Sequence, residues 1–284
     1  MEKLNLVDKS KSLKPIRKWV CHKLECFADY IEAYTAALGK ERSSYLELYA
    51  SSGKCLCKGT DCVIEDSALR ALAVKRKFDQ YILITRDARD AETLKQWTAF
   101  REANVNIITG NCVSERVLKR SFDLIPRSFS SFALIDPPGY RQLRWSTIRK
   151  LAAHGLDWKG HKTELLILFP LEMALLRNLT RPDCQLSINR LYGHRDWQEL
   201  SQQRLEGRIG SEKMRGELVR LFKEGLKGLG YKHVEDFKPA SPTSHPLYHV
   251  ISANDSGRRI KMISEAFGKA RYLPCELLYD KKIK

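Results

Sequence analysis

Two short stretches of this chain carry residues whose types and spacing could do chemistry. Residues 45–53 read Tyr-Leu-Glu-Leu-Tyr-Ala-Ser-Ser-Gly, an apolar run with one acid inside it that ends in small residues. Residues 132–139 read Phe-Ala-Leu-Ile-Asp-Pro-Pro-Gly, an apolar run that ends in a carboxylate and two prolines. Both patterns are typical of a buried strand that runs into a loop, where small residues let backbone N–H groups approach a ligand. Because each proline fixes its own φ and restricts the residue before it, Asp136 should be held extended at its strand end.

The second stretch resembles the catalytic D-P-P-Y loop of methyltransferases that modify amino groups of nucleobases. Together the two stretches indicate a class I S-adenosylmethionine-dependent methyltransferase fold, in which both loops lie at the carboxyl edge of the sheet. The resemblance implies that the catalytic residues are Asp136, Pro137, Pro138 and Tyr140. Gly139 stands where the motif has tyrosine, so either Tyr140 or Trp145 would have to stack a flipped base, or the substrate is not a base. The alternative for Asp136 is a structural role, ending a strand and capping the next turn.

The resemblance also implies where the cofactor would bind. S-adenosylmethionine would lie over the first loop, which contains the residues Glu47, Tyr49, Ala50, Ser51 and Gly53. In nucleoside-binding sheets an acid after the second strand takes the ribose hydroxyls; here residues 81–85 form that strand, and Asp87 follows two residues beyond its end. Asn111 follows the third strand, residues 105–109, where it could hydrogen-bond adenine or serve as a plain turn residue. Glu47, Ser51 and Asn111 differ from the residues that usually occupy these cofactor-binding positions, so we expect weak cofactor binding.

The periodicity of the chain predicts the elements that must position these loops. Apolar residues at three- and four-residue intervals predict a helix over 16–38, and further strands are predicted at 132–135 and 164–169. Strands that alternate with helices predict an α/β, doubly wound, mostly parallel sheet of Rossmann-like class I methyltransferase type. Residues 231–234 and 247–251 predict a closing antiparallel hairpin, with prolines in its connection, and a last helix follows over 259–267. The expected organisation is a helical cap (1–40), an α/β core (41–186), a helical insertion or lid (187–230) and C-terminal strands with a helix that complete the core (231–284).

The charge of the chain favours a nucleic-acid partner. The 50 Lys and Arg residues exceed the 34 Asp and Glu residues, which gives a formal net charge of +16. Such an excess attracts polyanions. Basic residues interleaved with an aromatic follow the Asp136 loop and predict contacts to phosphates and bases, at Arg141, Arg144, Trp145, Arg149 and Lys150. The alternative is a charged helix face with Trp145 packed inward. The cations Arg17, Lys18 and Lys23 of the first helix could form a phosphate-facing stripe, but a solvated face is the expectation.

Eight cysteines occur without a signal peptide or an apolar run of membrane-spanning length. We therefore expect a cytoplasmic protein with reduced thiols and no membrane association. Cys55, Cys57 and Cys62 lie close together, but no second pair with zinc-site spacing accompanies them. We expect no metal and interpret these cysteines as free thiols on an active-site loop.

Several segments taken together resemble the three-Cys-motif partner proteins, a bacterial family related to class I methyltransferases. Residues 45–53 are similar to its Y-i-D-l-F-A-G-P-G loop, residues 67–72 to its G-S-P-L-x-A-L helix start, and residues 133–139 to its f-l-D-P-f-G strand end. Residues 191–197 and 245–249 are similar to later motifs. The resemblance covers about residues 19–267 and implies a companion protein that carries a three-cysteine, radical-SAM-like motif. Glu47, Ser51, Ser52 and Asp66 depart from the family pattern.

Two functions from different classes follow. The first is a methyltransferase whose Asp136 orients a nucleobase amine in DNA or RNA. The second is a catalytically degraded, methyltransferase-like module that binds nucleic acid or the companion protein.

Overall fold

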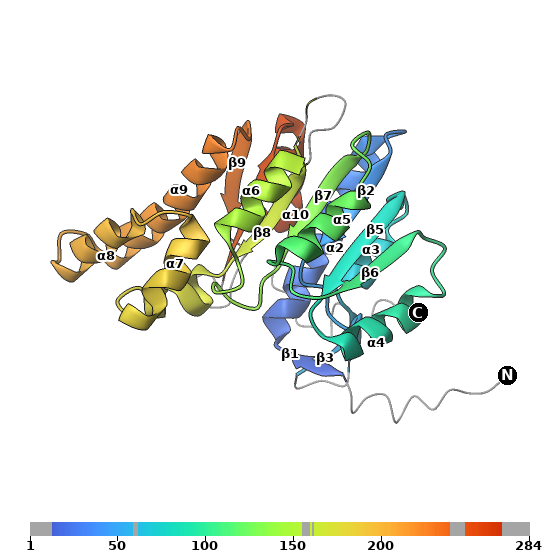
Figure 1. Ribbon diagram of the computed structural model, residues 1–284, viewed down its shortest axis with the longest axis horizontal. Coiled ribbons are helices and arrows are strands. Elements are labelled where there is room, and N and C mark those ends of the chain that lie inside the picture. Colours follow the sequence, from blue (N-terminus) through green and yellow to red (C-terminus); the bar gives the residue numbers. More distant parts are fainter. Residues whose placement is uncertain (1–12, 59–61, 155–159, 161, 239–247, 269–284) are drawn as a thin grey trace.

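The computed structural model describes residues 13–58, 62–154, 160, 162–238 and 248–268, and its centre is a seven-stranded sheet (Figure 1). The strands lie in the order β6-β5-β2-β7-β8-β10-β9. The first five pair in parallel, and β10 runs antiparallel to both of its neighbours. Their bounds are β2 Ser43–Glu47, β5 Gln80–Thr85, β6 Val105–Thr109, β7 Ser130–Ile135, β8 Glu164–Phe169, β9 His233–Phe237 and β10 His249–Asn254. This confirms the predicted mostly parallel α/β sheet and its antiparallel pair of C-terminal strands.

Helices cover both faces of the sheet, because the central strands are apolar on both sides. In β7, Leu134 packs in one core with residues of α2 (Lys18–Leu38), α3 (Ser67–Ala73) and α10 (Gly257–Gly268). Its neighbours Ala133 and Ile135 pack in the other core, with residues of α5 (Glu115–Asp123), α6 (Trp145–His154), α7 (Gln185–Tyr192) and α9 (Ser211–Gly228). This alternation follows from the two-residue period of a strand.

The helix predicted over 16–38 is α2, and its apolar positions face the sheet as the periodicity indicated. Phe27, Tyr30, Ile31 and Tyr34 are all buried. Asp87 precedes α4 (Ala88–Thr98), and Asp66 caps α3 by accepting a hydrogen bond from the backbone N–H of Leu69. The predicted proline-containing connection between the last two strands lies outside the described residues.

A small second sheet replaces the cysteine loop that the sequence suggested. It contains β1 (Lys14–Ile16), β3 (Lys54–Cys57) and β4 (Val63–Glu65), in the order β1-β3-β4. Cys55 and Cys57 lie on β3 and are buried, and Cys57 Sγ is 3.2 Å from Cys21 Sγ of α2. The cysteines are free thiols, as expected, but their placement on an active-site loop is wrong, because Cys55 and Cys57 pack this sheet against α2. Within the described residues no group of three His, Cys, Asp or Glu side chains is placed to hold a metal.

The connection from β8 to β9 is helical and long. It contains a π-helical turn (Leu171–Leu175), two 3-10 turns (Leu176–Asn178 and Pro182–Cys184), α7, α8 (Trp197–Leu205) and α9. Ile188 and Phe222, from α7 and α9, share the core with Phe169 of the sheet, whereas α8 extends beyond the sheet (Figure 1). No helix in the described part of the chain has the length and hydropathy needed to cross a membrane.

Candidate active site

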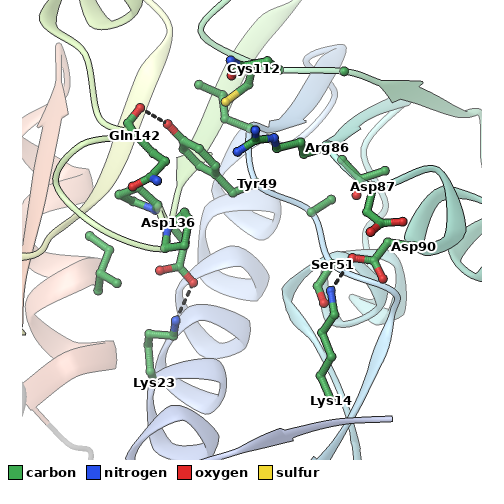
Figure 2. A pocket seen from close by; sticks show the side chains of 18 of the residues that line it. Lys14, Lys23, Tyr49, Ser51, Arg86, Asp87, Asp90, Cys112, Asp136 and Gln142 are labelled. Atoms are coloured by element: carbon green, nitrogen blue, oxygen red, sulfur yellow. Dashed lines mark hydrogen bonds and ion pairs between the residues drawn. The ribbon is translucent and has the colours of Figure 1, made fainter. Parts of the chain in front are cut away.

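A pocket of about 600 Å³ opens at the carboxyl edge of the parallel strands (Figure 2). The chain leaves β2 toward β5 on one side and later returns to β7 on the other, so the pocket lies where the direction of winding changes. Ligands bind at this point in open α/β sheets. The pocket is lined by Lys14, Trp19, Lys23, Leu48, Tyr49, Ala50, Ser51, Thr85, Arg86, Asp87, Asp90, Gly110, Asn111, Cys112, Asp136, Pro137, Pro138, Gln142 and Leu168. The fold thus brings both predicted loops to one cavity.

Asp136 lies at the end of β7 with its carboxylate in the pocket, and it forms an ion pair with Lys23 of α2 (Figure 2). The Lys23 side chain is only 6% exposed and the Asp136 side chain 19%. The Lys23 ammonium also lies 5.7 Å from the ring centroids of Trp19 and Phe27. The expectation that Lys23 sits on a solvated helix face is therefore wrong. A periodic pattern assigns a cation to the polar side of a helix, but here a carboxylate from a distant strand compensates its burial.

Glu47 and Gly53 lie behind the pocket rather than on it. The Glu47 carboxylate is buried and accepts hydrogen bonds from Tyr45 Oη at 2.8 Å and Ser67 Oγ at 2.5 Å. Burial, followed by repulsion from Asp66, raises the pKa of Glu47 to about 8. The Gly53 N–H donates to Asp66 Oδ2 at 2.8 Å. Both residues brace the loop from inside, which corrects the prediction that they would contact the cofactor.

Tyr49, Ala50 and Ser51 line the pocket, as predicted for this loop. Backbone hydrogen bonds tie the loop to the neighbouring strands, because Leu48 N–H donates to Leu134 O at 3.1 Å and Ala50 N–H to Ile84 O at 2.9 Å. The Tyr49 hydroxyl donates to the backbone oxygen of Gln142 at 2.6 Å (Figure 2). This bond joins the loop after β2 to the loop after β7 and fixes the Tyr49 ring on the pocket wall.

The residues that follow β5 and β6 line the far side of the pocket. Asp87 caps α4 by accepting from Arg89 N–H at 2.7 Å, and the Asn111 side-chain oxygen accepts from Val113 N–H at 3.3 Å. Arg86, which the sequence did not single out, is exposed and extends toward Tyr49 (Figure 2). Lys14 of the small sheet pairs with Asp90 at the pocket edge.

Tyr140 and Trp145 are not on the pocket. Tyr140 is buried, and its hydroxyl faces Arg141 Nε at 3.3 Å and Ser187 Oγ at 3.4 Å. The Trp145 ring packs edge-on against Phe222, with centroids 5.5 Å apart, and fills the space above the two glycines Gly193 and Gly225. The prediction that one of these rings stacks a base is wrong, because α6 turns Trp145 toward α9. The alternative, with Trp145 packed inward, describes its position.

The predicted basic cluster is spread over different environments. Arg141 and Arg149 are exposed, and Arg141 lies 3.7 Å from the Asp183 carboxylate. Lys150 pairs with Glu115 at 2.7 Å. Arg144 is half-buried, and its Nε lacks a hydrogen-bond partner among the described residues. Only Arg141 and Arg149 therefore offer the exposed charge expected of a phosphate contact.

Trp19, Lys23, Arg86 and Asp90 are pocket residues that the sequence left unassigned or placed elsewhere. Arg86 lies in the loop after β5, and Asp90 lies in the first turn of α4. Both are close in sequence to Asp87 at a strand end, and this location is a signal from which they could have been predicted. Trp19 and Lys23 carry no comparable signal, because a helical pattern does not tell which strand end the start of a helix will meet.

Comparison with known proteins gives neighbours of similar fold. No family model and no curated protein matches this sequence. Among solved structures, a Legionella pneumophila protein matches with a TM-score of 0.49 and 10% identity over 86% of this chain and 92% of its own. Aeropyrum pernix fibrillarin, which contains natively bound S-adenosyl-L-methionine, matches with a TM-score of 0.41 and 14% identity over 80% and 76%. A Leishmania major SAM-dependent methyltransferase matches with a TM-score of 0.42 and 11% identity over 82% and 72%.

Proposed function

We propose that this protein is an S-adenosylmethionine-dependent methyltransferase that acts on an amino group of a nucleic-acid base. The observation that carries the proposal is the position of Asp136. Its carboxylate, at the end of β7 and ahead of two prolines, opens on the same pocket as the small-residue loop after β2. A methyl acceptor beside Asp136 and a methyl donor over this loop would then share one cavity of about 600 Å³, a volume within the range typical of ligand sites.

The residues present fit the cofactor in three places. Ala50 and Ser51 provide a wall with little side-chain bulk for its amino-acid part, next to the Tyr49 ring. Asp87 lies at the end of β5, where ribose hydroxyls would need an acceptor, and Asn111 lies at the end of β6, where an adenine amine would need one. When bound, the cofactor supplies an electrophilic methyl group on a positively charged sulfur. The fixed face of Tyr49 and the nearby Asp136 carboxylate both favour a cation in this part of the pocket.

Asp136 is assigned the catalytic role. A nucleobase amine is a poor nucleophile because its lone pair is delocalised into the ring. The Asp136 carboxylate can accept one amine N–H and hold the nitrogen in place, and its negative charge stabilises the positive charge that develops during transfer. Removal of one preorganised group of this kind costs about 3–4 kcal/mol in the barrier. Pro137 and Pro138 fix the loop, so the carboxylate does not have to reorganise.

A pair of matched substitutions tests cofactor binding. Ser51→Phe places a ring in the pocket and should abolish the rise in melting temperature that S-adenosylmethionine gives by binding the native state. Ser146→Phe makes the same change at an exposed position of α6 and should retain the rise. Wild-type protein that shows no shift at millimolar cofactor, and no transfer of labelled methyl to DNA or RNA, would overturn the proposal.

The second candidate is a binding module with degraded catalysis, and two contacts favour it. The Glu47 carboxylate already accepts hydrogen bonds from Tyr45 and Ser67, and the Asp136 carboxylate is paired with Lys23. In this case the basic surface would hold nucleic acid, or the chain would serve a three-cysteine-motif companion, as membership of the three-Cys-motif partner family would imply. Cofactor titration separates the candidates, because only the methyltransferase requires the Ser51-dependent shift.

A further inference from the structure

Two of the cysteines between the small sheet and α2 lie next to each other. Cys21 Sγ of α2 is 3.2 Å from Cys57 Sγ of β3, and both residues are fully buried. Both are thiols rather than halves of a disulfide, and they lie 36 positions apart in the sequence. A disulfide has an S–S distance of about 2.0 Å, so the two sulfur atoms have to approach by only roughly 1 Å to form one.

The surrounding structure holds these two sulfur atoms side by side. Both cysteines belong to the hydrophobic cluster that also contains Leu24 of α2 and Ile64 of β4. Strand β3 pairs with β1 on one side and with β4 on the other. The backbone N–H of Cys57 itself donates to Cys62 O at 3.0 Å. Because hydrogen bonds hold the backbone of β3 on both sides, rotation of the two side chains, rather than movement of the backbone, would bring the sulfur atoms together.

The two elements that carry these cysteines also contribute to the wall of the candidate active site. Trp19 and Lys23 of α2 line the pocket, and Cys21 lies between them in the sequence. Strand β1, which pairs with β3, supplies Lys14 to the same pocket (Figure 2). A bond between Cys21 and Cys57 would therefore join a helix and a sheet that both border the pocket, and would restrict movement of one against the other.

We propose that Cys21 and Cys57 are a site of reversible oxidation, at which a disulfide joins the small sheet covalently to α2. The oxidant is hydrogen peroxide. One cysteine attacks a peroxide oxygen as its thiolate, the O–O bond breaks, and the departing hydroxide takes up the thiol proton, which leaves a sulfenic acid and one water molecule. The second thiol attacks the sulfenic sulfur, forms the S–S bond and releases a second water molecule. A small-molecule dithiol reverses the modification by thiol–disulfide exchange.

Burial and proximity determine how this pair of thiols reacts. Because both side chains are buried, peroxide reaches them only when this part of the protein opens locally, so oxidation should be slower than that of an exposed cysteine. Once one sulfur is oxidised, the other lies beside it and should capture the sulfenic acid before sulfinic acid forms. The new bond closes a loop in the unfolded chain and should stabilise the folded protein. None of these steps requires methyl transfer, so the disulfide is independent of the proposed function.

The test treats the full-length reduced protein with hydrogen peroxide and follows its intact mass and its tryptic peptides. We expect the mass to fall by two hydrogen atoms and the peptide of residues 19–23 to be linked to that of residues 55–58. Cys57→Ala and Cys21→Ala should each abolish the link. Cys55→Ala is the matched control, because it removes a buried cysteine of the same strand and the same peptide, and it should retain the link. The linked wild type should unfold at a urea midpoint higher by roughly 1 M, and dithiothreitol should reverse this shift.

Three outcomes would overturn the inference. One is a wild-type protein that gains oxygen atoms instead of losing hydrogen atoms, because its sulfur atoms then do not meet. Another is a link that survives Cys57→Ala or Cys21→Ala, which would assign the bond to a different pair. The third is a linked protein whose urea midpoint is no higher than that of the reduced protein. Thermal unfolding verifies that each reduced variant is folded, and either alanine variant alone is sufficient if the other does not fold.

Discussion

The Lys23 ammonium of α2 and the Asp136 carboxylate of β7 form an ion pair across 113 positions of sequence. The pair holds the start of α2 against the strand end that carries the D-P-P motif. It also stabilises the charged Lys23 side chain, which is only 6% exposed, beside the candidate active site. This contact changes what substitutions at either residue should do.

Asp136→Ala should destabilise the protein and not only inactivate it. The substitution leaves the buried Lys23 cation without its counter-charge. Breaking one side of a buried pair costs about 3–5 kcal/mol, which denaturant unfolding would measure. Lys23→Met combined with Asp136→Ala should recover most of this loss, because no unpaired charge remains. An Asp136→Ala protein that unfolds at the wild-type midpoint would show that the pair is not formed.

Glu47→Gln should make the protein more stable at alkaline pH than the wild type. The folded-state pKa of about 8 lies above the ordinary value of 4.5, so the native state keeps a proton that the unfolded chain releases. Wild-type stability should therefore fall as the pH rises from about 4.5 to 8, and the gap to the variant should widen over the same range. Urea unfolding at several pH values measures this gap. Glu199→Gln, at an exposed position of α8, is the control and should show no such trend.

Trp145→Ala should lower stability rather than nucleic-acid affinity. The ring fills the space between α6 and α9, and loss of a packed tryptophan costs about 3–5 kcal/mol. Gly225→Ala provides a coupled test, because a Cβ there would lie 2.8 Å from the Trp145 ring. It should destabilise the wild type more than it destabilises the Trp145→Ala variant. Equal effects in the two backgrounds would mean that the ring is not packed on Gly225.

Binding of nucleic acid should depend on salt and on the exposed arginines after the Asp136 loop. Arg141→Ala with Arg149→Ala should weaken binding to single-stranded DNA and reduce the slope of log K against log salt by about 1.4, since each phosphate contact contributes about 0.7. Arg144 is left unchanged in this variant, because its side chain is half-buried and its Nε atom is not exposed. Arg204→Ala with Arg208→Ala on and after α8 is the matched control. A protein without affinity for DNA or RNA at low salt would contradict the nucleic-acid assignment.

The sequence was sufficient where local chemistry decides the structure. Residues 80–85 and 164–169 are strands because each contains a continuous apolar run, and Asp66 caps a helix because its side chain reaches N–H groups three residues away. The loop of Tyr49 to Ser51 and the position of Asp136 also followed from the sequence. A strand that ends in small residues, or in an acid before proline, delivers these groups to one edge of a parallel sheet.

Only the tertiary structure decided which side chains meet in the pocket. Glu47 was predicted from a motif position to face the cofactor, but hydrogen bonds from Tyr45 and Ser67 hold it inside. Lys23 was expected in solvent, but Asp136 stabilises its burial, and Trp19 provides the pocket aromatic that Tyr140 and Trp145 do not. The physical reason is that hydrophobic period and backbone preference act over a few residues, whereas the partner of a charge or a ring is set by packing between segments a hundred residues apart.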